Sequence, residues 1–291
     1  MTGDELAQGE PARGSVEEPA WPCSGTVGGV PFVALPPTAV DAPTRDGLIV
    51  CWHAFDPPRT EAAMAAALPM TGVPVWRVYL GLRSPDPAEH DYLQLLASTV
   101  ERAAAELPEV VAALREPLGL GDGAVGLAGH GEGAMAALLV LAEQRIPVSA
   151  AALIAPVWRP ERVIEARERR LGAYSWTPET LAIAERLDLA DRVDDIARAD
   201  PRLLLVGGAS DLLVPVDQVE ELRRLLGEAG AASAESVTFR MGHALAAEPG
   251  VEPRAPLTAA VSVDAALTDW FRRHLGTNTP KASRPLAVNL G

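Results

Sequence analysis

Residues 126–133 read Gly-Leu-Ala-Gly-His-Gly-Glu-Gly, and their setting decides the fold. A short apolar stretch precedes them, and a long apolar run, 134–141, follows. A strand, a tight glycine-rich turn and a helix in this order match the pattern Gly-x-Ser-x-Gly, which presents a serine at the top of a sheet. The outer glycines of that pattern are Gly129 and Gly133, and the central residue is Gly131. The sequence therefore predicts the turn without its nucleophile.

Three further segments complete the layout. Asp211 follows an apolar run that predicts a buried strand, and His243 follows a second such run. Upstream, the apolar run 48–52 leads into residues 53–55, which read His-Ala-Phe. With turn, Asp and His in this order, the chain resembles the α/β-hydrolases, on the esterase, thioesterase and dienelactone-hydrolase side. The resemblance covers roughly residues 28–275.

The resemblance implies an α/β architecture, the α/β-hydrolase fold. We expect a mostly parallel, doubly wound sheet of about eight strands with a helical cap. One domain is expected over residues 23–276, with the cap inserted at about 157–200. Residues 1–22 are acidic and poor in large apolar groups, which predicts a disordered arm. Residues 277–291 are expected to form a flexible tail.

The resemblance also implies roles for the central site residues. In the family a serine attacks a carbonyl, a histidine takes its proton and an aspartate orients the histidine. Carried onto this chain, Asp211 orients and His243 is the base, while Gly131 leaves the nucleophile position vacant. A competing interpretation makes Asp211 a helix N-cap.

Backbone amides are expected to form an oxyanion hole beside this position. They belong to Glu132 and to Ala54 or Phe55. His53 is interpreted as an oxyanion-loop residue held by backbone contacts, with a direct catalytic role as the alternative. His130 is expected to pack beside the site, and the Glu132 carboxylate to find a local partner rather than act as acid or base.

Aromatic and thiol side chains leave alternatives open. Trp158, Tyr174 and Trp176 either line a substrate pocket under the cap or serve in ordinary packing. Cys51 alternates with His53 along its strand and is a less favoured replacement nucleophile, because buried thiols are usually inert.

Composition excludes several function classes. The net charge of −14 argues against nucleic acid and anionic membranes as partners. The sequence contains neither a secretory pattern nor a membrane-length apolar run, so we expect a cytoplasmic protein. Metal-ligand spacing is missing, so no metal or cofactor is expected, and Cys23 and Cys51 are not expected to pair. The single lysine, Lys281, lies in the tail, which argues against Schiff-base chemistry.

The missing nucleophile shapes the functional prediction. Its removal from a triad costs about 10⁶-fold in kcat, so acyl-enzyme hydrolysis is not expected. We predict an enzyme of bacterial small-molecule metabolism that uses a His243–Asp211 general base and an oxyanion hole. The chemistry would be that of a lyase, dehydratase, cyclase or isomerase, or direct water attack. The alternatives are an inactive pseudo-hydrolase that binds a ligand or serves as a scaffold, and an engineered inactive variant of a serine esterase.

Overall fold

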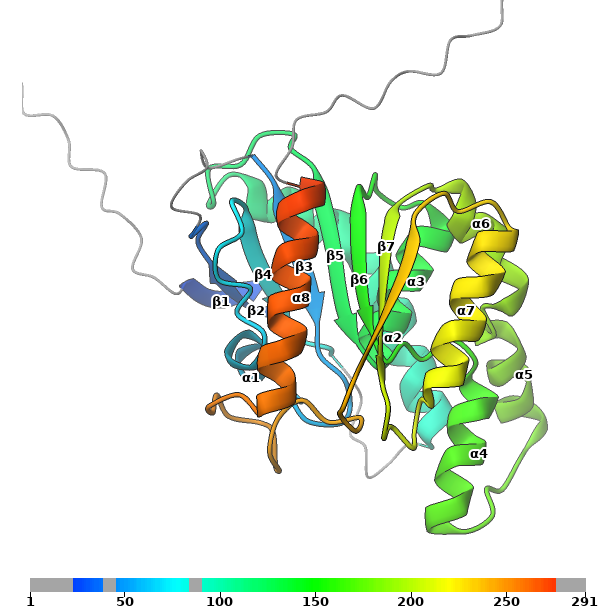
Figure 1. The fold of residues 1–291 in the computed structure, drawn as a ribbon. Helices are drawn as coiled ribbons and strands as arrows, with labels where there is room; N and C mark the ends of the chain where they lie inside the picture. The colour runs from blue at the N-terminus through cyan, green and yellow to red at the C-terminus, as the bar shows by residue number, and fades with distance from the viewer. Residues whose placement is uncertain (1–22, 39–45, 84–90, 276–291) are drawn as a thin grey trace, which may run out of the picture.

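The computed structural model describes residues 23–38, 46–83 and 91–275. They form an eight-stranded sheet with helices on both of its faces (Figure 1). The arm predicted for residues 1–22 and the tail predicted for 277–291 lie outside the described residues.

The strand order brings the middle of the chain to the centre of the sheet. The order is β1-β2-β4-β3-β5-β6-β7-β8. The strands are β1 (Cys23–Val27), β2 (Val30–Leu35), β3 (Leu48–Trp52), β4 (Trp76–Leu80), β5 (Val125–His130), β6 (Ala150–Ile154), β7 (Arg202–Gly208) and β8 (Ala234–Phe239). β2 pairs antiparallel with β1 and β4, and the strands from β4 to β8 pair in parallel.

A topological switch point lies between β3 and β5. The chain runs from β3 outward to β4 on one side, then returns to β5 on the other side of β3. Parallel α/β sheets bind ligands at the carboxyl ends of their strands, at such a switch point. Residues 53–55 and the turn at Gly131 both follow these two carboxyl ends.

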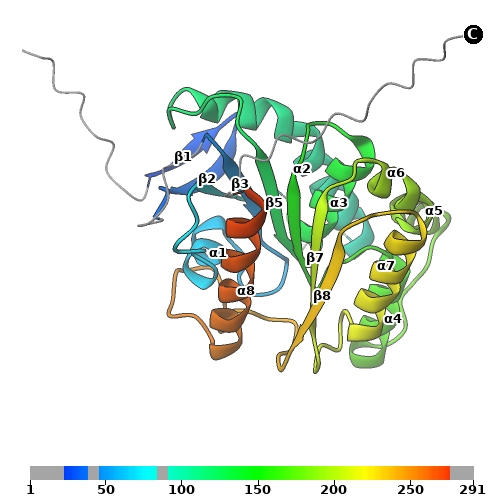
Figure 2. The same ribbon diagram turned by 45° about the horizontal axis from the view of Figure 1, so that its top comes forward.

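Helices cover the two faces unequally. The helices are α1 (Glu61–Ala67), α2 (Tyr92–Arg115), α3 (Glu132–Glu143), α4 (Pro160–Leu171), α5 (Pro178–Leu187), α6 (Val193–Arg198), α7 (Val216–Glu228) and α8 (Thr258–Leu275). α1 and α8 pack on one face, and α2, α3, α6 and α7 on the other (Figure 2). Within the described ranges no helix has the length and apolarity needed to cross a bilayer.

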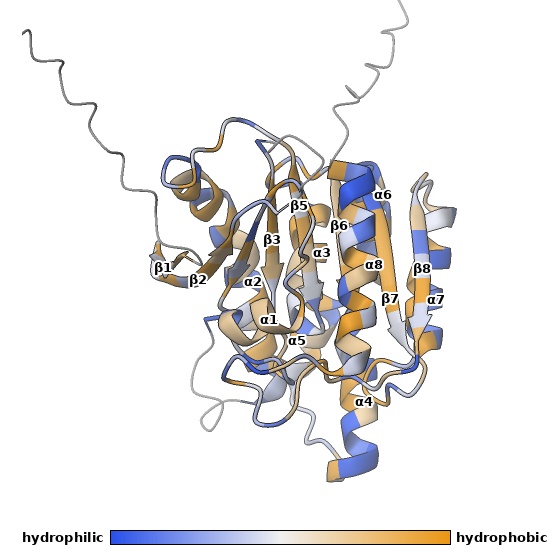
Figure 3. Ribbon diagram, turned by 60° about the vertical axis from the view of Figure 1, so that its left-hand side comes forward, coloured by the Kyte–Doolittle hydropathy of each residue, from blue (hydrophilic) through white to orange (hydrophobic). Residues whose placement is uncertain are grey.

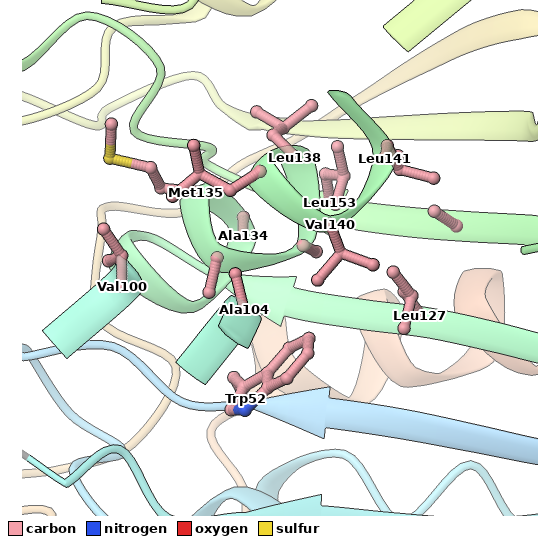
Figure 4. Packing of buried hydrophobic residues seen from close by; sticks show 14 of the residues in the cluster. Trp52, Val100, Ala104, Leu127, Ala134, Met135, Leu138, Val140, Leu141 and Leu153 are labelled. Atoms are coloured by element: carbon pink, nitrogen blue, oxygen red, sulfur yellow. The ribbon is translucent and has the colours of Figure 1, made fainter. Parts of the chain in front are cut away.

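The core explains why α3 is apolar all round. This helix is buried between the sheet, α2 and α6. One apolar cluster joins α3, α2 and β3, and its members include Met135, Leu138, Val100, Ala104 and Trp52 (Figure 4). The first residue of α3 follows Gly131 directly, so this packing fixes the position of the turn.

One expected helix boundary is wrong. The sequence predicts that Pro108 breaks the helix beginning near residue 91 or starts a second one, but α2 continues through Pro108 to Arg115. A proline in a helix interior removes a hydrogen bond and clashes with the preceding turn. Leu107, Val111 and Leu114 are nevertheless buried on either side of it. The continuous apolar face therefore holds the helix together.

The segment between β6 and β7 contains two kinds of helix. α4 extends beyond the carboxyl ends of the strands, and most of its projecting part is coloured as hydrophilic in Figure 3, whereas α5 packs against α2. α6 instead packs against α3 and α7 in the layer that covers the sheet. Within the segment expected to form the cap, the outer part of α4 thus projects beyond the sheet, while buried residues of α4 and α5 join the core.

Candidate active site

Gly131 occupies a backbone conformation that favours glycine. Its φ of 54° and ψ of −114° lie outside the regions that L side chains normally populate. The flanking glycines are required by close contact, since a Cβ on Gly129 would lie 2.5 Å from the carbonyl carbon of Gly133. A Cβ on Gly133 would in turn collide with the carbonyl oxygen of His53. The turn therefore keeps the tight geometry that its sequence predicts.

His243 and Asp211 meet beside this turn, on the loops that follow β8 and β7. The His243 Nδ1 atom donates to Asp211 Oδ2 at 2.9 Å. Asp211 Oδ1 accepts from the amides of Leu213 and Val214 at 2.8 and 2.9 Å. Asp211 thus holds both the imidazole and the turn before α7, whereas the N-cap of that helix is Pro215.

The second ring nitrogen of His243 faces Gly131. A Cβ at Gly131 would lie 3.2 Å from His243 Nε2 and 3.0 Å from the Cβ of Ala54. His243 Nε2 is buried and has no hydrogen-bond partner among the described residues. Because Nδ1 carries the proton given to Asp211, Nε2 of the neutral ring is a free acceptor. The geometry directs a proton acceptor at Gly131.

Charge around His243 favours its protonated form. Burial by itself lowers the pKa of an imidazole, but the hydrogen bond and charge of Asp211 outweigh it and raise the pKa of His243. The charges of Glu132 and Asp56 act in the same direction. Burial tends to raise the pKa of Asp211, yet the hydrogen bond and charge of His243 lower it overall. The two shifts agree, because each partner stabilises the charged form of the other.

Two further histidines are held as neutral rings. Burial lowers the pKa of His130 to about 3 and that of His53 to about 4. His130 Nε2 donates to the carbonyl oxygen of His243 at 2.8 Å, which fixes the backbone of His243. His53 Nε2 accepts from the amide of Leu82 at 3.0 Å, so its Nδ1 donates to the carbonyl of Ala54 at 2.8 Å. Both rings are therefore uncharged near neutral pH, and their lowered pKa values make them weaker bases than a solvent-exposed histidine.

Glu132 binds the loop after β3. Its Oε2 accepts from the backbone amide of Phe55 at 2.9 Å, and its Oε1 accepts from the hydroxyl of Tyr92 at 3.1 Å. The side chain is fully buried at the start of α3. The expected local partner of Glu132 is therefore the Phe55 amide itself. The sequence predicts an oxyanion hole that uses the amide of Ala54 or Phe55, and in this structure the Phe55 amide donates to a carboxylate instead.

The aromatic residues of the inserted segment hold it in place. Trp158 is buried in the core, and Tyr174 and Trp176 pack edge to face at 4.9 Å. The Tyr174 hydroxyl bonds to the side chain of Asp91, which caps α2. Arg167 on α4 extends the same interface, because its guanidinium lies 4.2 Å from the centre of the Tyr92 ring.

The environment of Cys51 makes its thiol unreactive. It lies in the apolar cluster beneath α1 and α8, and burial raises the pKa of its thiol. A thiol is a nucleophile only as the thiolate, so this environment makes it inert. Cys51 and Cys23 are both free. In the described part of the chain, no group of three or more His, Cys, Asp or Glu side chains is arranged to hold a metal ion.

Sequence reasoning missed Tyr92, Arg167 and Asp56. Tyr92 opens α2 and Arg167 lies midway along α4, and neither belongs to a spaced pattern. Their relation to Glu132 and His243 arises only when α2 and α4 are brought together at the carboxyl end of the sheet.

The similarity of this chain to known proteins lies in its structure and not in its sequence. No protein-family model matches the sequence, and no curated protein matches it either. TT1662 from Thermus thermophilus aligns with 85% of this chain and 97% of its own, at a TM-score of 0.58 and 20% identity. The Pyrococcus furiosus esterase Pf2001 aligns with 87% of this chain and 91% of its own, at a TM-score of 0.56 and 13% sequence identity.

A larger enzyme shares the same core. Pyrococcus horikoshii acylaminoacyl peptidase aligns with 87% of this chain but 41% of its own length, at a TM-score of 0.59 and 13% identity. The chain has the α/β-hydrolase fold. The predicted fold class is thereby confirmed, and its structural neighbours include an esterase and a peptidase. Within this α/β-hydrolase fold, Gly131, Asp211 and His243 follow the strands β5, β7 and β8 in chain order.

Proposed function

We propose that the protein is an enzyme of small-molecule metabolism in which His243, polarised by Asp211, acts as a general base at Gly131 without a covalent acyl-enzyme. The observation that carries this proposal is the buried Nε2 of His243, which has no partner in the described residues and faces the position of a missing side chain. A buried polar atom without a partner is costly unless a function uses it.

The arrangement supports one proton-transfer step. His243 Nε2 accepts a proton from a water or from an acidic group of the substrate, and the imidazolium that forms is stabilised by Asp211 at 2.9 Å. The proton returns to the product or to solvent. Because the Phe55 amide is donated to Glu132, developing negative charge is not stabilised by that amide. This argues against acyl transfer and leaves proton transfer at His243 as the step that the site supports, as a lyase, dehydratase, cyclase or isomerase would use it or as direct water attack would.

The Glu132–Phe55 hydrogen bond also favours a second candidate function. Because Glu132 binds the Phe55 amide, the site lacks one hydrogen-bond donor that acyl transfer would need. The binding of a ligand does not depend on that donor. A pseudo-hydrolase that binds a small molecule or serves as a scaffold is consistent with this contact.

One experiment separates the two candidates. A bacterial small-molecule extract is incubated with the wild-type protein, with His243→Gln and with Asp211→Asn, and products and retained ligands are followed by mass spectrometry. The proposal predicts a product with the wild type, none with His243→Gln, and a slower yield with Asp211→Asn. His274→Gln on α8 is the matched control and keeps full activity. A ligand retained equally by all four proteins, with no product from the wild type, supports the binding protein and overturns the enzyme.

A further inference from the structure

The position of the Glu132 carboxylate determines which ligand charge is favoured at this site. An oxyanion hole stabilises negative charge through N–H groups aimed at the place where that charge develops. Here the Phe55 N–H is aimed at Glu132 Oε2, at 2.9 Å. The side chain is fully buried, so water screens its charge little. A substrate anion approaching the same amide meets a like charge, whereas a cation meets an opposite one.

Other charges act on the site in the same sense. The carboxylates of Asp211, Glu132 and Asp56 all stabilise the protonated form of His243. His130 and His53 face the same region and are neutral, because burial lowers the pKa of each ring. Arg59 lies 3.9 Å from Asp56, but its guanidinium also donates to the carbonyl of Phe55 and to Glu248.

The protein places the cation of Arg167 against the aromatic ring whose hydroxyl binds Glu132. The guanidinium of Arg167, from α4, lies 4.2 Å from the centre of the Tyr92 ring, and the Tyr92 hydroxyl donates to Glu132 Oε1 at 3.1 Å. Phe55 meets the same ring edge to face at 6.2 Å. Aromatic faces attract cations, and that attraction is greater away from water. The surroundings of Glu132 thus combine a carboxylate with an aromatic face that accepts a positive group.

A second and independent observation points to a ligand. The His243 side chain is only 9% exposed, and its Nε2 faces Gly131 without a partner in the described structure. In the neutral ring this atom is an acceptor. An ammonium group supplies several N–H donors, so it pairs with an acceptor nitrogen and is attracted by a nearby carboxylate. A carbonyl oxygen supplies no donor to Nε2.

We infer that Glu132 sets the ligand preference of this site. The preferred ligand is a small molecule that bears an amine or another cationic hydrogen-bond donor. A carbonyl compound that becomes an oxyanion during the reaction is disfavoured. The inference rests on the proposed function in that it concerns the same site, and it assigns the chemical class of the substrate. Glu132 is a specificity-determining residue, and His243 remains the base.

The test compares charged probes of similar shape. Benzylammonium, benzyl alcohol and phenylphosphonate are titrated into protein labelled with ¹³C at histidine Cε1, and the His243 signal is followed by NMR. We expect benzylammonium to bind at least tenfold more tightly than phenylphosphonate. In Glu132→Gln this ratio should fall by tenfold or more, while the amide oxygen of Gln still accepts from Phe55. The control Asp217→Asn removes a charge from the exposed first turn of α7 and should leave the ratio unchanged.

Three results overturn the inference. They are equal or tighter binding of phenylphosphonate by the wild type, an unchanged ratio in Glu132→Gln that keeps the wild-type amide spectrum, and no response of the His243 signal to any probe. The proposed function fails separately. A cation preference together with turnover that survives His243→Gln overturns the general base alone, and His243-dependent turnover without a cation preference overturns the ligand class alone.

Discussion

The carboxylate of Glu132 accepts the backbone N–H of Phe55 at 2.9 Å, across 77 residues of sequence. Glu132 follows Gly131 directly, so two adjacent residues alter the two elements of acyl-transfer chemistry. In the proposed function, Gly131 supplies no nucleophile, and Glu132 binds the amide of Phe55, one of the two loop amides proposed for the oxyanion hole. A serine at position 131 therefore restores only one of the two.

Stepwise substitution should recover ester hydrolysis in measurable increments. Gly131→Ser should give weak hydrolysis of p-nitrophenyl acetate, because Ala54 is 3.0 Å from the new Cβ and the Phe55 amide is still engaged. Adding Ala54→Gly relieves the contact. Adding Glu132→Ala frees the amide and should raise kcat by about 10²-fold, the usual effect of one oxyanion-hole donor. The control is the same variant with His243→Ala, which should be inactive. A triple variant no faster than Gly131→Ser contradicts the assignment of the Phe55 amide.

The wild-type protein should not react with a fluorophosphonate probe. Gly131 has no side chain, and the thiol of Cys51 is buried with a raised pKa. Intact-mass measurement should show no adduct on the wild type and a single adduct on Gly131→Ser. Stoichiometric labelling of the wild type at the site would show that another residue serves as the nucleophile.

The architecture was readable from the sequence because glycine and apolar patterning are local. The glycines around Gly131 are dictated by contacts within the turn, and the apolar runs predict the central strands. The hairpin of β1 and β2 was not predicted, although its signal is present: Gly28 and Gly29 both have positive φ, which a two-residue hairpin turn of type I′ requires. The helix boundary predicted at Pro108 was wrong, because the local propensity of proline opposes a helix that tertiary packing maintains.

The site was only partly readable, because its decisive contact is not local. Asp211 and His243 come together as the chain order predicts. The contact between Glu132 and Phe55 depends on β3 and β5 being neighbours, and that between Tyr92 and Arg167 depends on how α4 meets α2. No spacing in the sequence reports these side-chain pairings. The carboxylate at position 132 could be seen, but its partner could not.

The titration of His243 tests the dyad directly. Its pKa in the folded protein should lie above the ordinary value of about 6.5, since Asp211, Glu132 and Asp56 outweigh burial. Asp211→Asn should lower it, because the neutral amide no longer stabilises the imidazolium, and Asp217→Asn should leave it unchanged. The measurement is the His243 Cε1 proton shift as a function of pH. Equal midpoints in wild type and Asp211→Asn would show that the 2.9 Å contact is not formed in solution.

Acid should destabilise the fold through its two neutral histidines. The pKa values of His130 and His53 are about 3 and about 4 in the folded protein, so between pH 6.5 and 4.5 the unfolded chain takes up protons that the folded chain does not. Each ring then reduces the free energy of unfolding by about 2–3 kcal/mol over that range. Urea unfolding at both pH values should show a smaller loss in His130→Gln.

The sign of this effect distinguishes His130 from His243. A raised folded pKa means that the stabilising contribution of His243 is complete below about pH 6.5 and is lost as the pH rises through its folded pKa. His243→Gln should therefore change the pH dependence above 6.5, whereas His130→Gln changes it below. Identical pH profiles for the two variants would contradict both assignments.

Replacing Pro108 with alanine should stabilise the protein. Proline in a helix interior is about 3 kcal/mol less favourable than alanine, and the extra freedom that alanine gives the unfolded chain offsets about 1 kcal/mol. A net gain of about 2 kcal/mol should raise Tm by roughly 4–8 °C for a chain of this size. Pro178 is the matched control, because it opens α5, where proline needs no N–H and has a suitable φ. Pro178→Ala should therefore leave Tm unchanged or lower it. A Tm of Pro108→Ala at or below the wild-type value would mean that α2 is bent at this position to fit α3, and that straightening it costs packing along the interface that positions Gly131.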